Sequence, residues 1–464
     1  MLLISWLSGR RSSNDDFFRG GRSQKWWVVA FAMIGSCMSG VTFVSVPGMV
    51  GAASMGYLQM CIGFFVGYLV IAFVLTPIYF KYDLVSVYGY LDKRFGLSSY
   101  RTGAWFFFIS KLLGASVRLF LVCLILQLLV FGPLGLPFIL NVAVTMAIVL
   151  AYTFRGGVKS VIWTDNLKTF CMTASVVLCI VFIAKGLGLD FKGLAGAVSD
   201  SGMSRVFFFD DVNHPQFFWK QFLGGVFMVV AMTGLDQDLM QRTLACKNVK
   251  DSQKNLIISS LLQTVVIALF LVLGVLLYTY ASRTGIPETG DELFPAVATY
   301  GTLPSIVGVM FILGLVSCSF NAGGSALTAL TTSFTVDILG TKGEGPSVTR
   351  TRKGVHIAMA LLMALTIAVF NLVNSTSAID AVYKLASYTY GPILGMFAFG
   401  ILVRRRVRDR LVPLVAIAAP LICLVLQLNS ERWFGGYTFS YELLLLNALF
   451  TFLGLCLLIN SENV

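Results

Sequence analysis

The chain has 464 residues, of which 57% are hydrophobic and only 12% are charged, and its mean hydropathy is +0.83. This composition excludes a soluble globular protein and predicts one that crosses a membrane many times. The net charge of +12 does not indicate a nucleic-acid partner, because the basic residues are spread over six loops instead of gathering on one face.

Twelve apolar segments, most of them about 20 residues or longer, predict an all-α bundle that forms a single membrane domain over residues 1–464. The segments are 26–50, 56–80, 102–131, 136–153, 160–185, 216–240, 255–281, 304–337, 355–374, 378–403, 411–428 and 438–460. Residues 1–7 are too few to span alone, so we expect either the end of a truncated N-terminal helix or a loose N-terminus.

The loops between these segments fall into two alternating sets that differ in basic residues. One set holds 24 of the 34 lysines and arginines, and the positive-inside rule places it in the cytoplasm. All twelve segments alternate consistently with this assignment. We therefore expect a multi-pass protein of the cytoplasmic (inner) membrane, with the lipid bilayer as its surroundings.

The first segment carries signals for a break in its helix. Residues 35–48 include three glycines, Pro47 and several hydroxyl side chains within a stretch of membrane-spanning length. Backbone groups freed by a break cannot face lipid, where each unsatisfied group costs several kcal/mol. We therefore expect the break to line a cavity or an ion site, which is typical of a transport protein.

The segments also suggest an internal symmetry. Residues 26–185 and 216–403 each contain five segments, and residues 411–460 contain two more. Because five is odd, the second group starts in the opposite orientation to the first, as an inverted-topology repeat requires. The first segment of the second group is interrupted near residues 231–234. In such a fold the central site lies where the two broken helices cross.

Charged residues inside the segments are candidates for functional or paired sites. Lys111 and Arg118 lie seven residues apart on one helix face, so they either pair with neighbouring helices or contact a solute. The nine cysteines show no paired CxxC spacing, and the two histidines fall in or beside loops. No GxSxG, Walker or HExxH pattern is present, so the sequence predicts no enzyme.

Six motifs together resemble the sodium:solute symporter family. They are SGVTF at 39–43, YLDKRF at 90–95, GGVKSVIWTD at 156–165, GLDQDLMQR at 234–242, SALTALTTSFTVD at 325–337 and GPILG at 391–395. The resemblance covers essentially the whole chain. It implies a LeuT-type 5+5 inverted-repeat fold with two extra C-terminal helices and an alternating-access mechanism. The implied function is sodium-coupled uptake of a small polar solute, with sodium as the coupling ion and no other cofactor.

The resemblance also implies a sodium site between the first and eighth segments. Its carbonyls would come from Gly35, Met38 and Cys318, and its two hydroxyl positions fall on Asn321 and Ala322. An asparagine still offers an amide oxygen, whereas alanine offers none. Because sodium is a hard cation that needs several oxygen ligands, this departure from the family pattern predicts weakened binding.

A second cation position, found in some family members, would use Asp165 and Ser325. Lys168 lies three residues after Asp165, where the family usually has an uncharged glutamine. At this spacing we expect the two side chains to pair. The pair is either a static salt bridge or a device in which the Lys168 ammonium replaces a bound cation and couples transport to protons.

The remaining candidates concern the solute and the gate. Ser39 and Thr42 share one face of the broken helix, and the side chains of Gln59, Arg118 and Tyr388 are expected to project toward the same cavity. An arginine suits a carboxylate, which favours an organic acid, a sialic-acid-like sugar or an amino acid. For Asp236, Asp238 and Arg242, we expect (i, i+4) pairing that closes a cytoplasmic gate.

Two alternatives to sodium-coupled transport remain open from the sequence. One keeps the fold but makes the protein a proton-coupled or uncoupled carrier, because the sodium-site hydroxyls are missing. The other is a solute sensor, although the chain ends at Val464 without a signalling domain.

Overall fold

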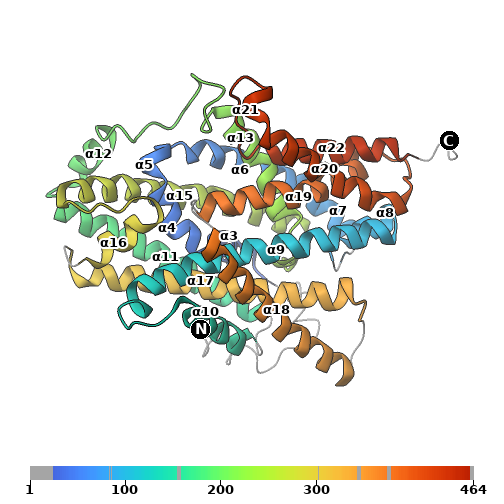
Figure 1. Ribbon diagram of the computed structural model, residues 1–464, viewed down its shortest axis with the longest axis horizontal. Helices are drawn as coiled ribbons and strands as arrows, with labels where there is room; N and C mark the ends of the chain where they lie inside the picture. The colour runs from blue at the N-terminus through green and yellow to red at the C-terminus, as the bar shows by residue number, and fades with distance from the viewer. Residues whose placement is uncertain are drawn as a thin grey trace.

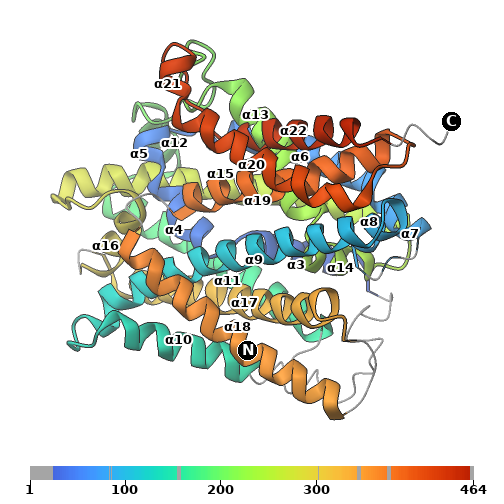
Figure 2. The same cartoon turned by 45° about the vertical axis from the view of Figure 1, so that its right-hand side comes forward.

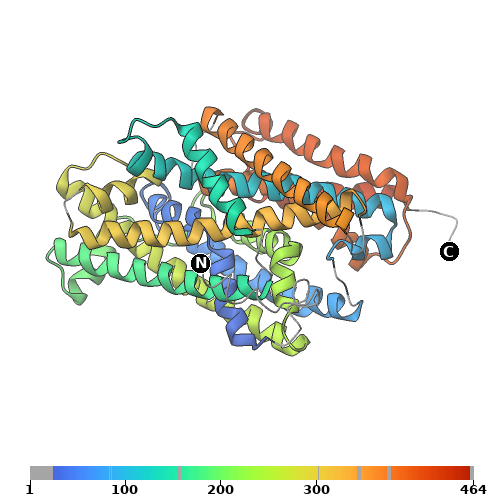
Figure 3. The same ribbon diagram turned by 90° about the horizontal axis from the view of Figure 1, so that it is seen from below.

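The computed structural model describes residues 24–82, 84, 86–153, 158–300, 303–341, 346–373 and 378–459, and these residues are almost entirely helical. The long helices run roughly along one axis of the molecule, as Figures 1 and 3 show from two directions. The predictions for residues 1–7 lie outside the described part of the chain.

The first span is broken, as its sequence predicted. Helix α3 (Trp26–Cys37) ends before Met38, helix α4 (Gly40–Gly48) begins after Ser39, and the two halves are bent by 62°. Met38 and Ser39 both have extended backbone angles. Pro47 lies inside the last turn of α4 and does not cause the break. The break therefore falls at Met38 and Ser39, directly before Gly40.

The other helices of the first half follow in chain order. They are α5 (Val50–Ala53), α6 (Tyr57–Val70), α7 (Thr76–Lys81), α8 (Gly89–Arg94), α9 (Leu97–Leu126), α10 (Phe138–Thr153), α11 (Val158–Gly186) and α12 (Phe191–Ser199). A π-turn at Ile71–Leu75 joins α6 to α7, and another at Gln127–Phe131 ends α9.

The second half begins with another broken span. Helix α13 (Phe218–Val229) passes through a π-turn (Val230–Gly234) and is followed by α14 (Gln237–Leu244) at an angle of 71°. The remaining helices are α15 (Val249–Thr284), α16 (Leu293–Thr299), α17 (Ser305–Ser333), α18 (Pro346–Val373), α19 (Ala378–Leu402), α20 (Val412–Leu428), α21 (Ser430–Trp433) and α22 (Leu443–Leu457).

Each of the twelve predicted spans has a helical counterpart among the described residues. Seven helices are long and apolar enough to cross a membrane, and the two bent pairs bring this number to nine. Three shorter apolar helices, at Phe138–Ala151, Ser305–Val316 and Leu443–Leu457, fall within the other predicted spans. The fold is the predicted LeuT-type inverted-repeat bundle with two extra C-terminal helices. The division into repeats at 26–185 and 216–403, with 411–460 outside them, stays a prediction.

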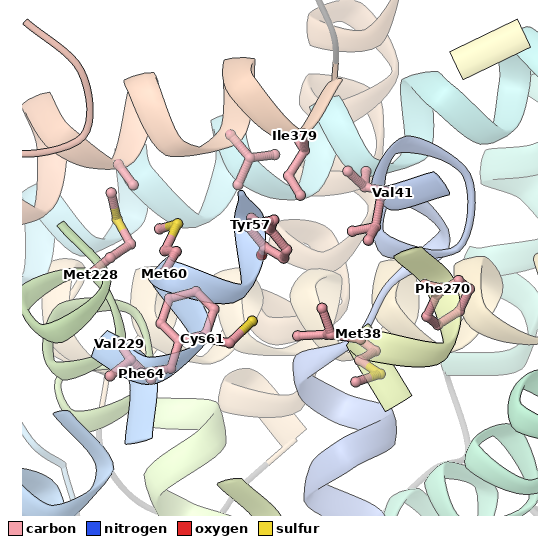
Figure 4. Close-up of a cluster of buried hydrophobic side chains, with 14 of the residues drawn as sticks. Met38, Val41, Tyr57, Met60, Cys61, Phe64, Met228, Val229, Phe270 and Ile379 are labelled. Atoms are coloured by element: carbon pink, nitrogen blue, oxygen red, sulfur yellow. The ribbon is translucent and has the colours of Figure 1, made fainter. Parts of the chain in front are cut away.

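The broken first span lies inside the bundle. Helix α4 contacts α9, α15, α17 and α19, and Figures 1 and 2 both place it among the long helices. Phe43 of α4 stacks on Phe294 and meets Phe270 and Phe311 in a buried aromatic cluster. Figure 4 shows Met38 and Val41, on either side of the break, near Phe270. Packing on several sides fixes the position of the break.

Candidate functional site

A central cavity lies where the two broken spans approach each other. Its walls come from both halves of the first broken span, from α13 and α14, and from α6, α9, α11, α15, α17 and α19. Ser39, Thr42, Arg118, Asp165, Lys168, Ala322, Ser325, Asp236, Asp238 and Arg242 are the sequence-predicted candidates that line it. The structure thus brings ten of the sixteen candidate residues to one cavity.

The two hydroxyls at the break cap the helix that follows. The Ser39 side chain accepts a backbone N–H from the first turn of α4, and the Thr42 Oγ1 accepts the Ser39 N–H at 3.3 Å. In an unbroken helix the Ser39 N–H would bond the Gly35 carbonyl, so this cap releases that carbonyl from the helix ladder. Carbonyls at a helix C-terminus carry partial negative charge. The end of α3 is therefore suited to a cation.

The residues expected at the first sodium site lie close to this helix end. A Cβ built on Gly35 would come within 2.7 Å of the Asp165 carbonyl, so α3 packs tightly on α11 here. Met38 and Cys318 are buried, and Ala322 faces the cavity without an oxygen to offer. The side chain of Asn321 lies outside the described part of the chain. Of the five residues expected at this site, the four with described side chains could therefore offer an ion only backbone oxygens.

A buried carboxylate organises the end of the cavity that adjoins α14. Asp236 precedes α14 and caps it by accepting the N–H groups of Asp238 and Leu239 at 2.9 and 3.2 Å. The same carboxylate accepts the Lys111 ammonium at 2.8 Å and the Tyr390 hydroxyl at 3.2 Å. Three elements, α9, α14 and α19, are thereby joined. Lys111 thus has the interhelical partner that the sequence left open.

Arg242 extends this network to two further helices. Its Nη1 lies 3.3 Å from Asp238, its Nε 3.4 Å from Asp165, and its Nη2 donates to Ser325 at 3.1 Å. Asp165 also accepts the Ser36 hydroxyl at 2.9 Å. The guanidinium therefore occupies the space between Asp165 and Ser325. The proposed second cation position does not fit a sodium ion in this arrangement, which corrects that expectation.

Lys168 does not form the ion pair that its spacing predicted. Asp165 pairs with Arg242, and within the described part of the chain the Lys168 ammonium has no hydrogen bond or ion pair. The Lys168 side chain is nevertheless only 1% exposed and lines the cavity. Arg118 lines the same cavity, also without a hydrogen bond or ion pair to the described residues. Sequence spacing alone could not show that Arg242, 77 positions away, competes for Asp165.

Two candidate solute ligands lie elsewhere. The Gln59 amide binds the Gln216 carbonyl at 2.9 Å and the Phe208 N–H at 3.0 Å, so it fastens the loop before α13. Tyr388 donates its hydroxyl to Gln427 on α20. Neither residue lines the cavity. The expectation that they project toward it is wrong, because each polar group is used in packing.

The cavity wall also contains contacts that the sequence did not indicate. The hydroxyls of Tyr57 and Tyr383 lie 2.6 Å apart and join α6 to α19. Cys37 lies 3.2 Å from the Tyr68 hydroxyl, which donates to Gln263 at 3.1 Å. No local pattern links residues so far apart in the chain, so only the fold reveals them.

The family assignment rests on the length of the match. The model of the sodium:solute symporter family matches residues 17–409. The chain belongs to that family. As a sodium:solute symporter, it is a multi-pass membrane transporter that takes up a small solute by sodium-coupled secondary transport. The family consists of transporters and not of enzymes.

Two curated relatives indicate the range of this family. The sodium/sialic acid symporter NanT of Aliivibrio fischeri is 27% identical over 423 residues, covering 86% of this chain and 80% of that protein. The human sodium/iodide cotransporter is 23% identical over 420 residues, covering 86% of this chain and 64% of that protein. Neither identity is high enough to transfer a solute.

The solved structures agree with the fold. A substrate-bound, outward-open Na⁺-coupled sialic acid symporter superposes with a TM-score of 0.81 at 19% identity. The match covers 98% of this symporter and 94% of the solved chain. At this level of identity the similarity shows the fold alone.

Proposed function

We propose that this symporter takes up a monoanionic organic solute together with sodium across the cytoplasmic membrane. The observation that carries the proposal is the charge of the cavity wall. Four cationic side chains, Lys111, Arg118, Lys168 and Arg242, face three carboxylates, Asp165, Asp236 and Asp238, which leaves one positive charge in excess. A bound monoanion would neutralise that excess in a site where unbalanced charge is costly.

Arg118 is the candidate ligand for the negative group. It lines the cavity from α9, and the three carboxylates on the wall form ion pairs with Lys111 and Arg242. A guanidinium presents two parallel donors that match a carboxylate. The solutes named for the two relatives, sialic acid and iodide, are both anions. We infer that Ser39 and Thr42 contact the polar part of the solute, through the oxygen lone pairs and hydroxyl proton that the cap leaves unused.

The sodium ion is assigned to the end of α3. The released Gly35 carbonyl and the Met38 and Cys318 carbonyls would bind it, with Asn321 as a further ligand. Because Ala322 contributes no oxygen, this site is weaker than one with two hydroxyls. The same loss of an oxygen is the reason to test a second candidate function, a proton-coupled or uncoupled carrier.

The test uses the full chain reconstituted in liposomes. We expect uptake of sialic acid, lactate or iodide that needs a sodium gradient and stops when choline replaces sodium. Accumulation that persists in choline and follows a pH gradient would reject sodium coupling. Uptake of neutral sugars with no response to these anions would reject the anionic solute.

A matched pair of arginine variants tests the role of Arg118. Arg118→Gln should raise KM for the transported anion by about tenfold or more, because a buried charge would lose its partner. Arg283→Gln is the control, since Arg283 lies at the outer end of α15 and donates to the Leu187 carbonyl away from the cavity. Equal effects of the two substitutions would contradict the assignment.

A further inference from the structure

Lys168 is the one strongly buried cation of the cavity wall, among the described residues, that the ion-pair network leaves out. It is 1% exposed, whereas Lys111 and Arg242 are held by carboxylates at 2.8 to 3.4 Å. A lysine is rarely buried without a partner, because removing its charge from water costs several kcal/mol. A buried ammonium without an ion-pair partner in a transport cavity can gain its partner from a ligand that enters the cavity.

The groups around Lys168 show which ligand fits. The charged and titratable groups that act on the ammonium are Cys318 and Asp165, which attract it, and Arg242 and Arg118, which repel it. Asp165 is already engaged by Arg242 and Ser36. Three cations, Lys168, Arg242 and Arg118, thus share the single carboxylate of Asp165, and a ligand that offsets the excess is an anion.

We propose that Lys168 is a second cationic anchor for the negative group of the solute, acting together with Arg118, which lines the same cavity from α9. This inference rests on the proposed function, since it requires an anionic solute. It adds a specificity residue on α11 that the predicted solute ligands did not include. A solute whose acidic group lies between the two cations is bound from both sides.

The contacts favour this role over replacement of the sodium ion. An ammonium that stood in for sodium would donate to the carbonyls of Gly35, Met38 or Cys318. The structure has no such hydrogen bond, and all three groups belong to described backbone. The ammonium instead faces the cavity. The side chain is thus available to a solute rather than bound at the end of α3.

The experiment compares an acid with its uncharged derivative in the reconstituted full chain. The probes are sialic acid and lactate, each against its methyl ester as a competitor, in chloride and in sulfate buffers. Three variants are compared. Lys168→Gln and Lys168→Met remove the charge, and methionine keeps nearly the length of the lysine side chain. Lys168→Arg retains the charge. Lys220→Gln is the control, because Lys220 is also buried but donates to the Asn213 and Thr438 carbonyls at the other end of α13.

In the wild type we expect the acid to bind at least tenfold better than its ester. The two neutral variants should reduce that preference by about tenfold, Lys168→Arg should retain most of it, and Lys220→Gln should leave it unchanged. Thermal shifts induced by the acid in purified protein give the same comparison for a variant that transports poorly.

Each contrary result identifies what has failed. If the wild type does not prefer the acid to its ester, the proposal of an anionic solute is wrong, and the proposed role of Lys168 is wrong with it. If the wild type does prefer it and the neutral variants do so equally, only the role of Lys168 is wrong. A neutral variant that changes only the sodium half-saturation, or only the response to chloride, would assign Lys168 to those ions and overturn the proposal.

Discussion

Replacing Asp236 with asparagine tests whether the charge network controls access to the cavity from the cytoplasm. The Asp236 carboxylate binds the Lys111 ammonium at 2.8 Å, and the two side chains are 4% and 10% exposed. Asparagine keeps the shape of the side chain and is an equally good helix cap, so α14 should retain its N-terminus. The substitution therefore removes one charge and little else.

The structure sets the size of the expected effect. Breaking a buried ion pair by neutralising one partner costs about 3–5 kcal/mol. Lys111 has a second carboxylate in reach, since Asp238 lies 3.8 Å away, and this reduces the loss. If about 1.4 kcal/mol acts on the equilibrium between closed and open forms, the open population rises about tenfold. We expect Asp236→Asn to increase access by that factor.

Cys37 provides the assay because it lies at the end of α3 and lines the cavity. In a variant that retains Cys37 and lacks the other eight cysteines, the rate of reaction with a membrane-impermeant maleimide reports access. Inside-out vesicles expose the cytoplasmic side to the reagent. The predicted result is about tenfold faster labelling in Asp236→Asn, with Lys111→Met giving a similar increase and the double variant adding little to either.

Asp409→Asn is the matched control for this experiment. Asp409 is another cytoplasmic-end carboxylate, and it caps α9 by accepting the Ser98 and Ser99 N–H groups at 2.8 and 2.9 Å. Its loss should lower thermal stability without a change in labelling of Cys37. A Cys37 labelling rate in Asp236→Asn within twofold of the starting variant would refute the idea that the charge network closes the cavity. An equal increase of the rate in Asp409→Asn would refute it as well.

Three further predictions follow from the cavity and its surroundings. Ala322→Ser should lower the sodium concentration for half-maximal uptake by about tenfold, because it restores an oxygen at the candidate site; an unchanged value in sodium titrations would place the ion elsewhere. Gly35→Ala should destabilise the folded state by about 1–3 kcal/mol, since its Cβ would meet the Asp165 carbonyl, and thermal unfolding would measure this cost. Gln59→Ala should lower the melting temperature but leave the KM of the solute unchanged, because its amide holds the outer loop; a raised KM would return Gln59 to the solute site.

Local sequence signals were sufficient for the parts of the fold that depend on local chemistry. The glycines, Pro47 and hydroxyls of residues 35–48 predicted a break, which lies between α3 and α4, and apolar length predicted the spans. The orientation that the basic residues of the loops predict stays a prediction. These features follow from backbone freedom, solvation in lipid and charge placement, which act over a few residues at a time.

The candidate site was less predictable because its contacts join distant segments. The spacing of Asp165 and Lys168 suggested a pair, but Arg242 reaches Asp165 from another helix and carries more donors. Gln59 was expected in the cavity, yet a loop about 150 residues later takes its amide. The partner that each polar side chain contacts depends on how the helices pack, and a single sequence does not show that packing.

The reciprocal cap at the break has a mechanical consequence. Because the Ser39 N–H and the Thr42 hydroxyl satisfy each other, α4 completes its first turn without help from α3. Reorienting α3 would therefore break no backbone hydrogen bond of α4, so the hydrogen bonds of the backbone do not lock the angle at Met38. A change in the angle between the two half-helices would have to give up side-chain packing, of α3 on α11 and α15 or of α4 on α9, α15, α17 and α19, but no backbone hydrogen bond.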